Sequence, residues 1–118
     1  MRSLINRRAR QHEAERLVAL ARYNILDTLP EPAYDDVVEI ASCVAGTPIA
    51  LITLLDEHRQ WFKARVGLEV GSKPRDHSFC KYLLQLPLGE MLIVPDAHAD
   101  PRFANSPLVI ADPDIRFY

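Results

Sequence analysis

The sequence predicts an α+β domain in which helices cover one face of an antiparallel sheet. Two stretches with helical periodicity come first, and two apolar strand-like stretches separated by a short polar turn follow them. The rest of the chain alternates short helix and strand signals. A length of 118 residues with 48% hydrophobic content fits a globular domain with a single core.

The first helix is expected over residues 13–25, where apolar residues recur at three- and four-residue intervals. Two interpretations of its apolar stripe stay open, namely packing on its own domain or forming the seam of a parallel homodimer. The stripe consists of Ala14, Val18, Ala21 and Ile25.

Residues 1–12 are expected to form a basic lead-in to a domain that spans residues 13–118. Residues 1–23 hold six arginines and two glutamates, whereas the whole chain has 14 Lys and Arg against 16 Asp and Glu. No aromatic residue occurs among these arginines before Tyr23, and an acidic body repels phosphate, so nucleic-acid binding is not predicted. No signal peptide or membrane span is predicted, and the chain is expected to be cytoplasmic.

The prolines at positions 30 and 32 predict a rigid connector over residues 27–32. A second helix is expected to begin at Pro32 and to stop at Gly46. Cys43 is expected to pack beside its buried face. That face is predicted to contain Tyr34, Val37, Val38, Ala41 and Val44.

Residues 49–55 and 59–66 predict an antiparallel hairpin with a turn at residues 56–58. Strict alternation along the second strand places alternate side chains on one face. Those side chains are Trp61, Lys63 and Arg65, with Phe62, Ala64 and Val66 on the opposite, core face.

Beyond the hairpin the sequence patterns that indicate helices and strands are shorter. We expect a loop over residues 68–76, then a short helix over residues 77–86 capped by Asp76 or Ser78. A third strand is expected over residues 91–94. Further along, a helical turn is predicted to start at Asp100 and Pro101, and a strand at Ile115 to Tyr118.

Several uncommon sequence segments occur in the same order as in a known family. Together they resemble the GAF domains found at the N-termini of bacterial sensor histidine kinases and diguanylate cyclases. The matching segments are residues 17–32, 47–67, 78–80, 94–109 and 115–118. The resemblance implies a GAF-like antiparallel sheet with helices on one face. It also implies that the C-terminal strands are missing, so that the chain is expected to oligomerise or unfold easily.

The resemblance further implies a ligand pocket that involves the segment after the hairpin. An aromatic side chain with two cations suits an anionic planar molecule, although a solvent-facing surface explains the same alternation. The expected ligand-binding residues are Trp61, Lys63, Arg65, Ser78, Phe79, Cys80 and Phe103.

Catalytic and metal-binding residues are not predicted. His77 and Cys80 supply only two ligands, and the Asp96, His98 and Asp100 alternation is explained by turn and cap chemistry. Cys80 is followed by Lys81, whereas bilin-binding GAF domains commonly have a histidine after the attachment cysteine.

The predicted function is therefore sensing. A small molecule whose identity the sequence does not give, or homodimerisation through helix 13–25, controls a histidine kinase or diguanylate cyclase output domain outside this chain. Two alternatives stay open, a ligand-free structural dimerisation module and a GAF-fold thiol enzyme of the methionine sulfoxide reductase kind that uses Cys80. No cofactor is assigned.

Overall fold

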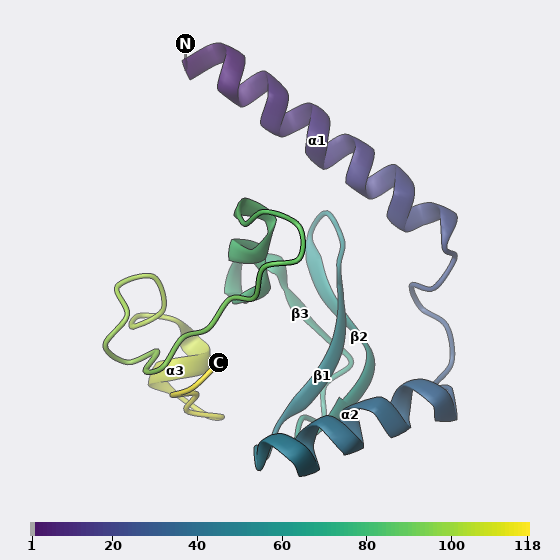
Figure 1. The fold of residues 1–118 in the computed structure, drawn as a ribbon, viewed down its shortest axis with the longest axis vertical. Coiled ribbons are helices and arrows are strands. Elements are labelled where there is room, and N and C mark those ends of the chain that lie inside the picture. Colours follow the sequence, from purple (N-terminus) through teal and green to yellow (C-terminus); the bar gives the residue numbers. More distant parts are fainter. Residues whose placement is uncertain (1) are drawn as a thin grey trace. The chain divides into compact units, whose positions relative to one another are not determined.

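The computed structural model describes residues 2–118, with all side chains except those of Arg2, Ser3 and Ile5. The chain divides into two compact units, Met1–Ser72 and Lys73–Tyr118. Helices accompany a three-stranded sheet with the strand order β1-β2-β3 (Figure 1), so the predicted α+β class is confirmed. Among the described residues, no helix is both long enough and apolar enough to span a membrane.

Helix α1 spans Arg2–Arg22 and begins about ten residues earlier than predicted. Residues 2–12 contain no proline or glycine, and their arginine, alanine and glutamine residues are good helix formers. The predicted lead-in is therefore part of the helix. Residues 2–12 lack the apolar periodicity on which the predicted start depended. Their helix propensity alone makes them helical.

The apolar stripe of α1 is turned away from its own unit. Ala14, Val18 and Ala21 are exposed, whereas Ile25, beyond the end of α1, is half-buried, and the half-buried residues of the helix lie on a neighbouring side. Arg16 holds that side in place by donating a hydrogen bond to the backbone oxygen of Leu55. Packing on its own domain is thus the wrong interpretation for these three residues.

Helix α2 spans Pro32–Ala45 and ends at Gly46, whose φ of 65° lies in the left-handed region, as predicted. Its predicted buried face is mostly wrong. Only Val38 is buried and Tyr34 is half-buried, because α2 rests on a narrow hairpin whose strands lie about 5 Å apart. The remaining members of the predicted set are exposed, as is the neighbouring cysteine: Val37, Ala41, Val44 and Cys43.

Strands β1 (Ala50–Leu55) and β2 (Arg59–Val66) form the predicted antiparallel hairpin. The register shifts between Ile52 and Thr53, because Ile52 pairs with Ala64 whereas Thr53 pairs with Phe62. Lys63 is therefore the extra residue of a β-bulge. The bulge interrupts the strict alternation on which the predicted face of β2 depended, and Gln60 to Ala64 are all buried.

The predicted loop over residues 68–76 contains regular structure. Strand β3 spans Ser72–Pro74, and a 3-10 helix follows at Arg75–His77. The backbone N–H of Phe62 donates to the oxygen of Gly71 over 3.1 Å, which continues the sheet beyond β2. The helix predicted over residues 77–86 is a shorter 3-10 helix at Cys80–Gln85.

The second unit is held together by a cluster of buried hydrophobic side chains and not by a sheet. Residues 91–94 and 115–118 are not strands, although Val94 and Tyr118 exchange two backbone hydrogen bonds of 2.6 and 2.9 Å. One such pair is too short a ladder to make a sheet. The buried core residues are Phe79, Val94, Ala97, Phe103, Leu108 and Val109.

Asp100 initiates a turn, as predicted, because its side chain accepts from the N–H of Arg102 over 2.9 Å and its backbone oxygen accepts from Phe103 and Ala104. The turn does not extend into a helix. Helix α3 (Pro107–Ile110), which was not predicted, follows it, and Ser106 caps its N-terminus by accepting from Leu108.

Candidate functional sites

The residues predicted to bind ligand divide between the two units. Trp61, Lys63 and Arg65 lie on β2 in the first unit and line one cavity. Ser78, Phe79 and Phe103 belong to the second unit and line another. We refer to these as the connector cavity and the aromatic cavity.

The connector cavity has a volume of about 460 Å³ and lies among α2, β2 and the connector between α1 and α2. The bulge at Lys63 helps to form it, because a bulged strand bends and re-aims its side chains. Its lining consists of Thr28, Pro30, Asp35, Val38, Glu39, Gly71 and residues 61–66.

Lys63 is the most deeply buried charge of this unit. Its Nζ atom donates to Thr28 Oγ1 over 2.8 Å and to the backbone oxygen of Leu29 over 2.7 Å. It also forms an ion pair with Glu31 at 2.6 Å and lies 5.2 Å from the ring centre of Tyr34. All these partners belong to the connector and the start of α2, so Lys63 fastens the connector to the sheet.

A second cation of β2 reinforces this attachment. Both guanidinium ends of Arg59 donate to the carboxylate of Asp27, over 2.7 and 2.8 Å. The hydrogen bond from Arg59, and secondarily its charge, lowers the pKa of Asp27 below its ordinary value, whereas desolvation opposes this shift. The connector is therefore fixed at both of its ends.

The connector cavity differs from the cation-rich wall expected from the sequence. Asp35 and Glu39 of α2 line it together with Arg65, and Lys63 already has acceptors for its charge. Because acids and bases balance, the electrostatic attraction for an anion is weak there.

The aromatic cavity has a volume of about 250 Å³ and lies within the second unit. Three rings form its apolar wall. Phe79 and Phe103 stack with ring centres 4.2 Å apart, and Tyr82 meets Phe103 edge-on at 5.0 Å. Polar groups complete the lining, which consists of residues 76–79, Lys81, Tyr82, Arg102, Phe103, Asn105, Ser106 and Pro107.

Two cations lie against these rings. Lys81 Nζ is 5.4 Å from the ring centre of Tyr82, and the Arg102 guanidinium is 5.0 Å from that of Phe103. Asp100 accepts from Arg102 over 2.8 Å, which orients the guanidinium and lowers the pKa of the Asp100 carboxyl. Asp76 also lines this cavity and Asp100 pairs with Arg102, so the rim carries less positive charge than its two cations alone; the aromatic wall with Lys81 beside it suits a planar anion.

Cys80, by contrast, does not line this cavity. It is buried, its backbone N–H donates to Ser78 Oγ over 2.9 Å, and its sulfur lies 3.0 Å from the hydroxyl oxygen of Tyr118. Burial, and secondarily the neighbouring sulfur, raises the pKa of the Tyr118 phenol. Ser78 is thus a local backbone partner of Cys80 as well as a lining residue.

Sequence reasoning missed Lys81, Tyr82 and Arg102. Tyr82 follows Phe79 by three residues, a spacing that brings side chains together in a 3-10 or α-helical turn. Arg102 adjoins both the predicted Phe103 and the capping residue Asp100. These spacings are visible in the sequence, but only the contacts of Lys81 and Arg102 with the rings identify the two cations as part of the cavity.

The alternating Asp96, His98 and Asp100 segment forms turns. The Asp96 side chain accepts from the N–H of His98 over 3.0 Å, and Asp100 is paired with Arg102. Across residues 2–118, no three His, Cys, Asp or Glu side chains converge in a way that suits a metal ion.

No protein-family model matches the chain. A 109-residue stretch, which is 92% of the chain, is 38% identical to part of a protein of Pseudomonas aeruginosa named cyclic di-GMP phosphodiesterase PA2567. The chain spans only 18% of the length of that relative. The similarity therefore concerns one segment of a much longer protein.

Proposed function

We propose that the chain is a non-catalytic regulatory domain of a cyclic di-GMP signalling protein, with a GAF-like architecture. Similarity to a segment of a cyclic di-GMP phosphodiesterase supports the signalling context, and that segment is less than a fifth of the relative. The earlier expectation of a histidine kinase or diguanylate cyclase output is accordingly widened to an output domain that makes, degrades or responds to cyclic di-GMP.

The same proposal assigns ligand binding to the aromatic cavity. The observation that carries it is the position of Lys81 and Arg102 against the rings of Tyr82 and Phe103. A planar ring of the ligand lies against Tyr82, the half-buried ring of the wall, and its negative group meets the two cations. Ser78, Asn105 and Ser106 supply polar groups that fix its orientation. The ligand class is a small anionic aromatic molecule, such as a nucleotide.

A titration followed by amide NMR tests this assignment, with cyclic di-GMP, cyclic GMP and GTP as probes and inorganic phosphate as the control without a ring. The largest shifts are expected at residues of the aromatic cavity. Arg102→Gln should weaken binding about tenfold, equivalent to about 1.4 kcal/mol. Arg116→Gln is the matched control, since Arg116 belongs to the same unit but does not line the cavity. Equal weakening by both substitutions, or shifts confined to other segments, would contradict the assignment.

Dimerisation is a second candidate function, and the exposed stripe of α1 favours it. Val18 is 54% exposed, and Ala14 and Ala21 are exposed beside it. A regulatory domain that acts by dimerising needs such a surface and needs no ligand. Sedimentation equilibrium of the native chain and of Val18→Glu measures the contribution of the stripe to self-association, and equal dissociation constants would exclude it.

A further inference from the structure

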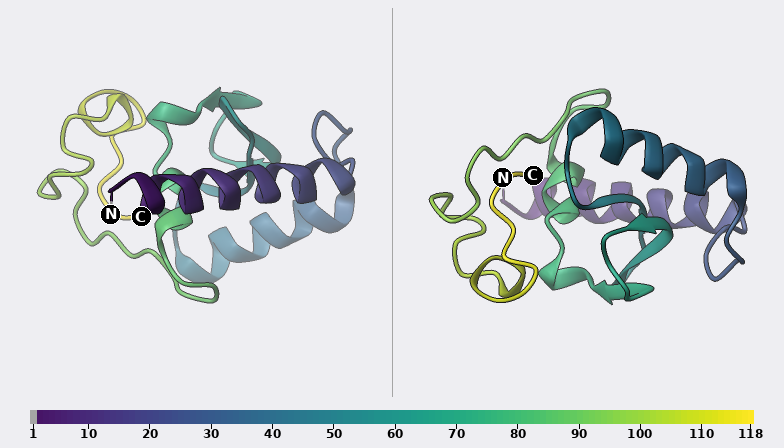
Figure 2. Two further views of the ribbon diagram at one scale, coloured as in Figure 1. Left: turned by 90° about the horizontal axis from the view of Figure 1, so that it is seen from above. Right: turned by 90° about the horizontal axis from the view of Figure 1, so that it is seen from below.

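The connector cavity lies beside the segment that joins α1 to α2. These two helices lie at opposite ends of the first unit, and the connector runs between them (Figure 2). Its residues Thr28 and Pro30 line the cavity, and Thr28 also accepts a hydrogen bond from Lys63 over 2.8 Å. A molecule bound there therefore touches the connector as well as α2 and β2.

Three charged groups of this cavity have no protein partner. Asp35 and Glu39 of α2 and Arg65 of β2 all line it. In the described part of the chain, no ion pair or side-chain hydrogen bond involves any of these three charges. The other charge of the lining, Lys63, is already paired with Glu31 at 2.6 Å. The charges left to meet a ligand are therefore two carboxylates and one guanidinium.

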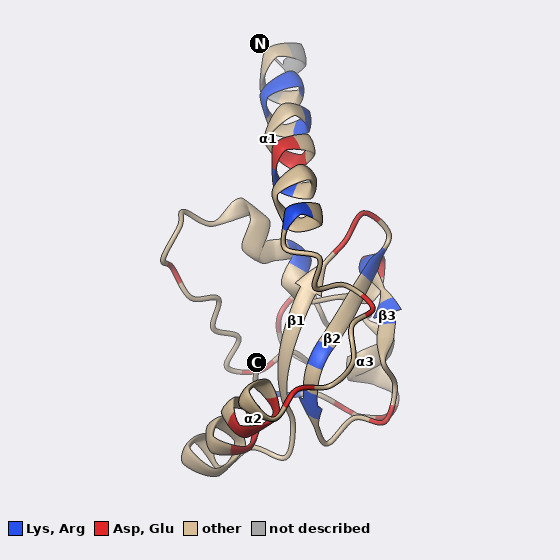
Figure 3. Cartoon of the chain, turned by 90° about the vertical axis from the view of Figure 1, so that its right-hand side faces the viewer, with Lys and Arg blue, Asp and Glu red and all other residues tan. Residues whose placement is uncertain are grey.

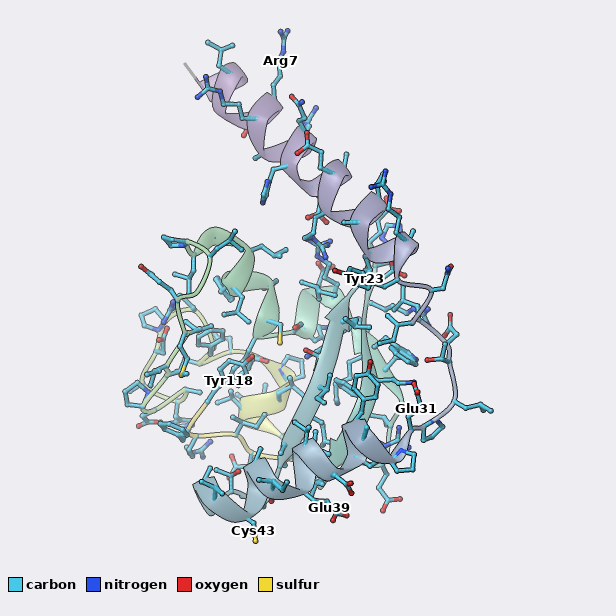
Figure 4. All side chains as sticks on the ribbon, turned by 45° about the vertical axis from the view of Figure 1, so that its right-hand side comes forward. Arg7, Tyr23, Glu31, Glu39, Cys43 and Tyr118 are labelled. Carbon is cyan, nitrogen blue, oxygen red and sulfur yellow. The ribbon has the colours of Figure 1, made fainter. Side chains whose placement is uncertain are left out.

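The unpaired charges of opposite sign come from different elements. Figure 3 shows acidic residues on α2 and basic residues on β2, where Arg65 lies. Asp35 and Glu39 are four residues apart, which puts them on one side of α2, beside the inward-packing Val38. Glu39 lies about two turns further along the chain than Glu31 (Figure 4), so its carboxylate is separate from the one that pairs with the buried lysine.

The indole of Trp61 is a further unsatisfied group of the same cavity. Trp61 is only 9% exposed, yet its indole N–H makes no hydrogen bond within the described chain. A buried indole N–H ordinarily has an acceptor. No side-chain nitrogen of the described residues is both sealed from water and unpaired, so this N–H is open to solvent-accessible space. Trp61 therefore has a donor to offer to a molecule in the cavity that it lines.

The rest of the lining is largely apolar. Val38, Phe62 and Ala64 are at most 4% exposed, and the Trp61 ring adds to their surface. The volume of about 460 Å³ is within the range of roughly 300–1,000 Å³ that is typical of sites for small molecules. A ligand that suits this lining has a short apolar stem and carries charged groups of both signs.

We propose that the connector cavity binds a free amino acid with a cationic side chain, of the arginine or lysine type. Its carboxylate pairs with Arg65 and accepts a hydrogen bond from the Trp61 N–H. Its two cationic groups meet Asp35 and Glu39, and its aliphatic stem packs against the apolar lining, where Val38 lies.

The charges of such a molecule are the complement of those that the cavity leaves unpaired. It carries two positive charges and one negative charge, whereas the cavity offers two carboxylates and one guanidinium. A nucleotide has the opposite excess of charge and is disfavoured here. The proposal concerns the first unit only, and it is independent of the ligand assigned to the aromatic cavity of the second unit.

A series of related ligands tests the proposal on the native chain. Trp61 is the only tryptophan, so its fluorescence reports directly on this cavity. L-Arginine should change the fluorescence saturably, with a dissociation constant of about 1 mM or below. L-Citrulline has a neutral side chain of similar shape, and agmatine lacks the carboxylate, so each should bind at least about tenfold more weakly. Equal affinity for L-arginine and L-citrulline, or no saturation by L-arginine and L-lysine up to about 10 mM, would overturn the proposal.

Two variants test the assigned contacts. Asp35→Asn with Glu39→Gln should weaken the binding of L-arginine at least about tenfold. Arg65→Gln should weaken L-arginine similarly but should not weaken agmatine, which has no carboxylate to pair with Arg65. The matched control is Asp36→Asn with Glu69→Gln, which removes two exposed carboxylates of the same unit outside the cavity. Circular dichroism confirms that each variant is folded, and equal weakening by the control would contradict the assignment.

Amide NMR separates this site from the aromatic cavity. L-Arginine should shift the indole N–H resonance of Trp61 and the amide resonances of Thr28 and Glu39. The nucleotide probes of the aromatic cavity should leave these three resonances in place. If L-arginine shifts only residues 73–118, the amino acid binds in the second unit and the proposal is wrong, whatever the nucleotides do.

Discussion

Lys63 and Glu31 form an ion pair of 2.6 Å in which the two side chains differ greatly in burial. The Lys63 side chain is fully buried, whereas 58% of the Glu31 side chain is exposed. Breaking the pair therefore has different consequences on its two sides. Without Lys63 the carboxylate returns to water, but without the carboxylate a buried ammonium group keeps neutral partners, namely Thr28, the backbone oxygen of Leu29 and the Tyr34 ring.

We therefore predict that Glu31→Gln lowers the free energy of unfolding more than Lys63→Met does. The expected losses are about 2 kcal/mol for Glu31→Gln and about 1 kcal/mol or less for Lys63→Met, because an apolar side chain of similar length can replace a buried charge at little cost. Urea denaturation measures both. In the double variant the loss should equal that of Lys63→Met, and a larger, additive loss would show that the two residues act separately.

The pair of Asp27 and Arg59 predicts a dependence of stability on pH. Its hydrogen bond lowers the pKa of Asp27 in the folded chain, so its stabilisation is complete above the unfolded value of about 3.9 and is lost as the pH falls through the lower folded value. Asp27→Asn should therefore make the decline in thermal stability below about pH 4 less steep.

Asp100, whose pKa Arg102 lowers, supplies the comparison. Asp100→Asn should remove a separate part of the acid sensitivity, so the variant with both substitutions should show the shallowest decline. Thermal melts at half-unit intervals of pH measure the slopes. If Asp27→Asn leaves the slope of the native chain unchanged, the ion pair does not contribute.

Gly67 and Gly46 both have positive φ, 82° and 65°, but only Gly67 lies in a crowded place. A Cβ atom on Gly67 would overlap the backbone oxygen of Pro48, whereas one on Gly46 would meet nothing within 4 Å. Gly46→Ala should cost about 1 kcal/mol, from the left-handed conformation alone. Gly67→Ala should cost at least about twice as much, since the hairpin must also shift. Similar losses in chemical denaturation would contradict this account.

Cys80 is expected to serve as a packing residue beside Tyr118 and not as a nucleophile. Its burial and its contact with the phenol leave room for a hydroxyl, so Cys80→Ser should lower the stability by about 1 kcal/mol and leave ligand binding intact. In the native fold, a thiol reagent should label Cys43 and spare Cys80. Loss of a measured activity in a folded Cys80→Ser protein would favour the thiol-enzyme alternative.

The sequence alone determined the elements that local chemistry specifies. Pro32 and Gly46 bound α2 because one residue fits the first helical turn and the other the left-handed cap. The hairpin of β1 and β2 follows from two apolar runs around a polar turn, and Asp100 starts a turn through its own side chain. Ser78, Phe79 and Phe103, which the resemblance implied as pocket residues, line the aromatic cavity, whereas Cys80 does not.

The tertiary structure decided which faces these elements bury. Periodicity shows that α1 and α2 each have an apolar stripe, but a narrow hairpin covers only one line of side chains, so Val37 and Val44 remain exposed. The bulge at Lys63 also depends on tertiary structure. Whether a strand holds an extra residue is set by its pairing with the neighbouring strand, and the bulge breaks the alternation of faces that the sequence predicts. The buried ion pair of Lys63 with Glu31 and the contact of the Arg102 guanidinium with the Tyr82 ring likewise join residues that only folding brings together.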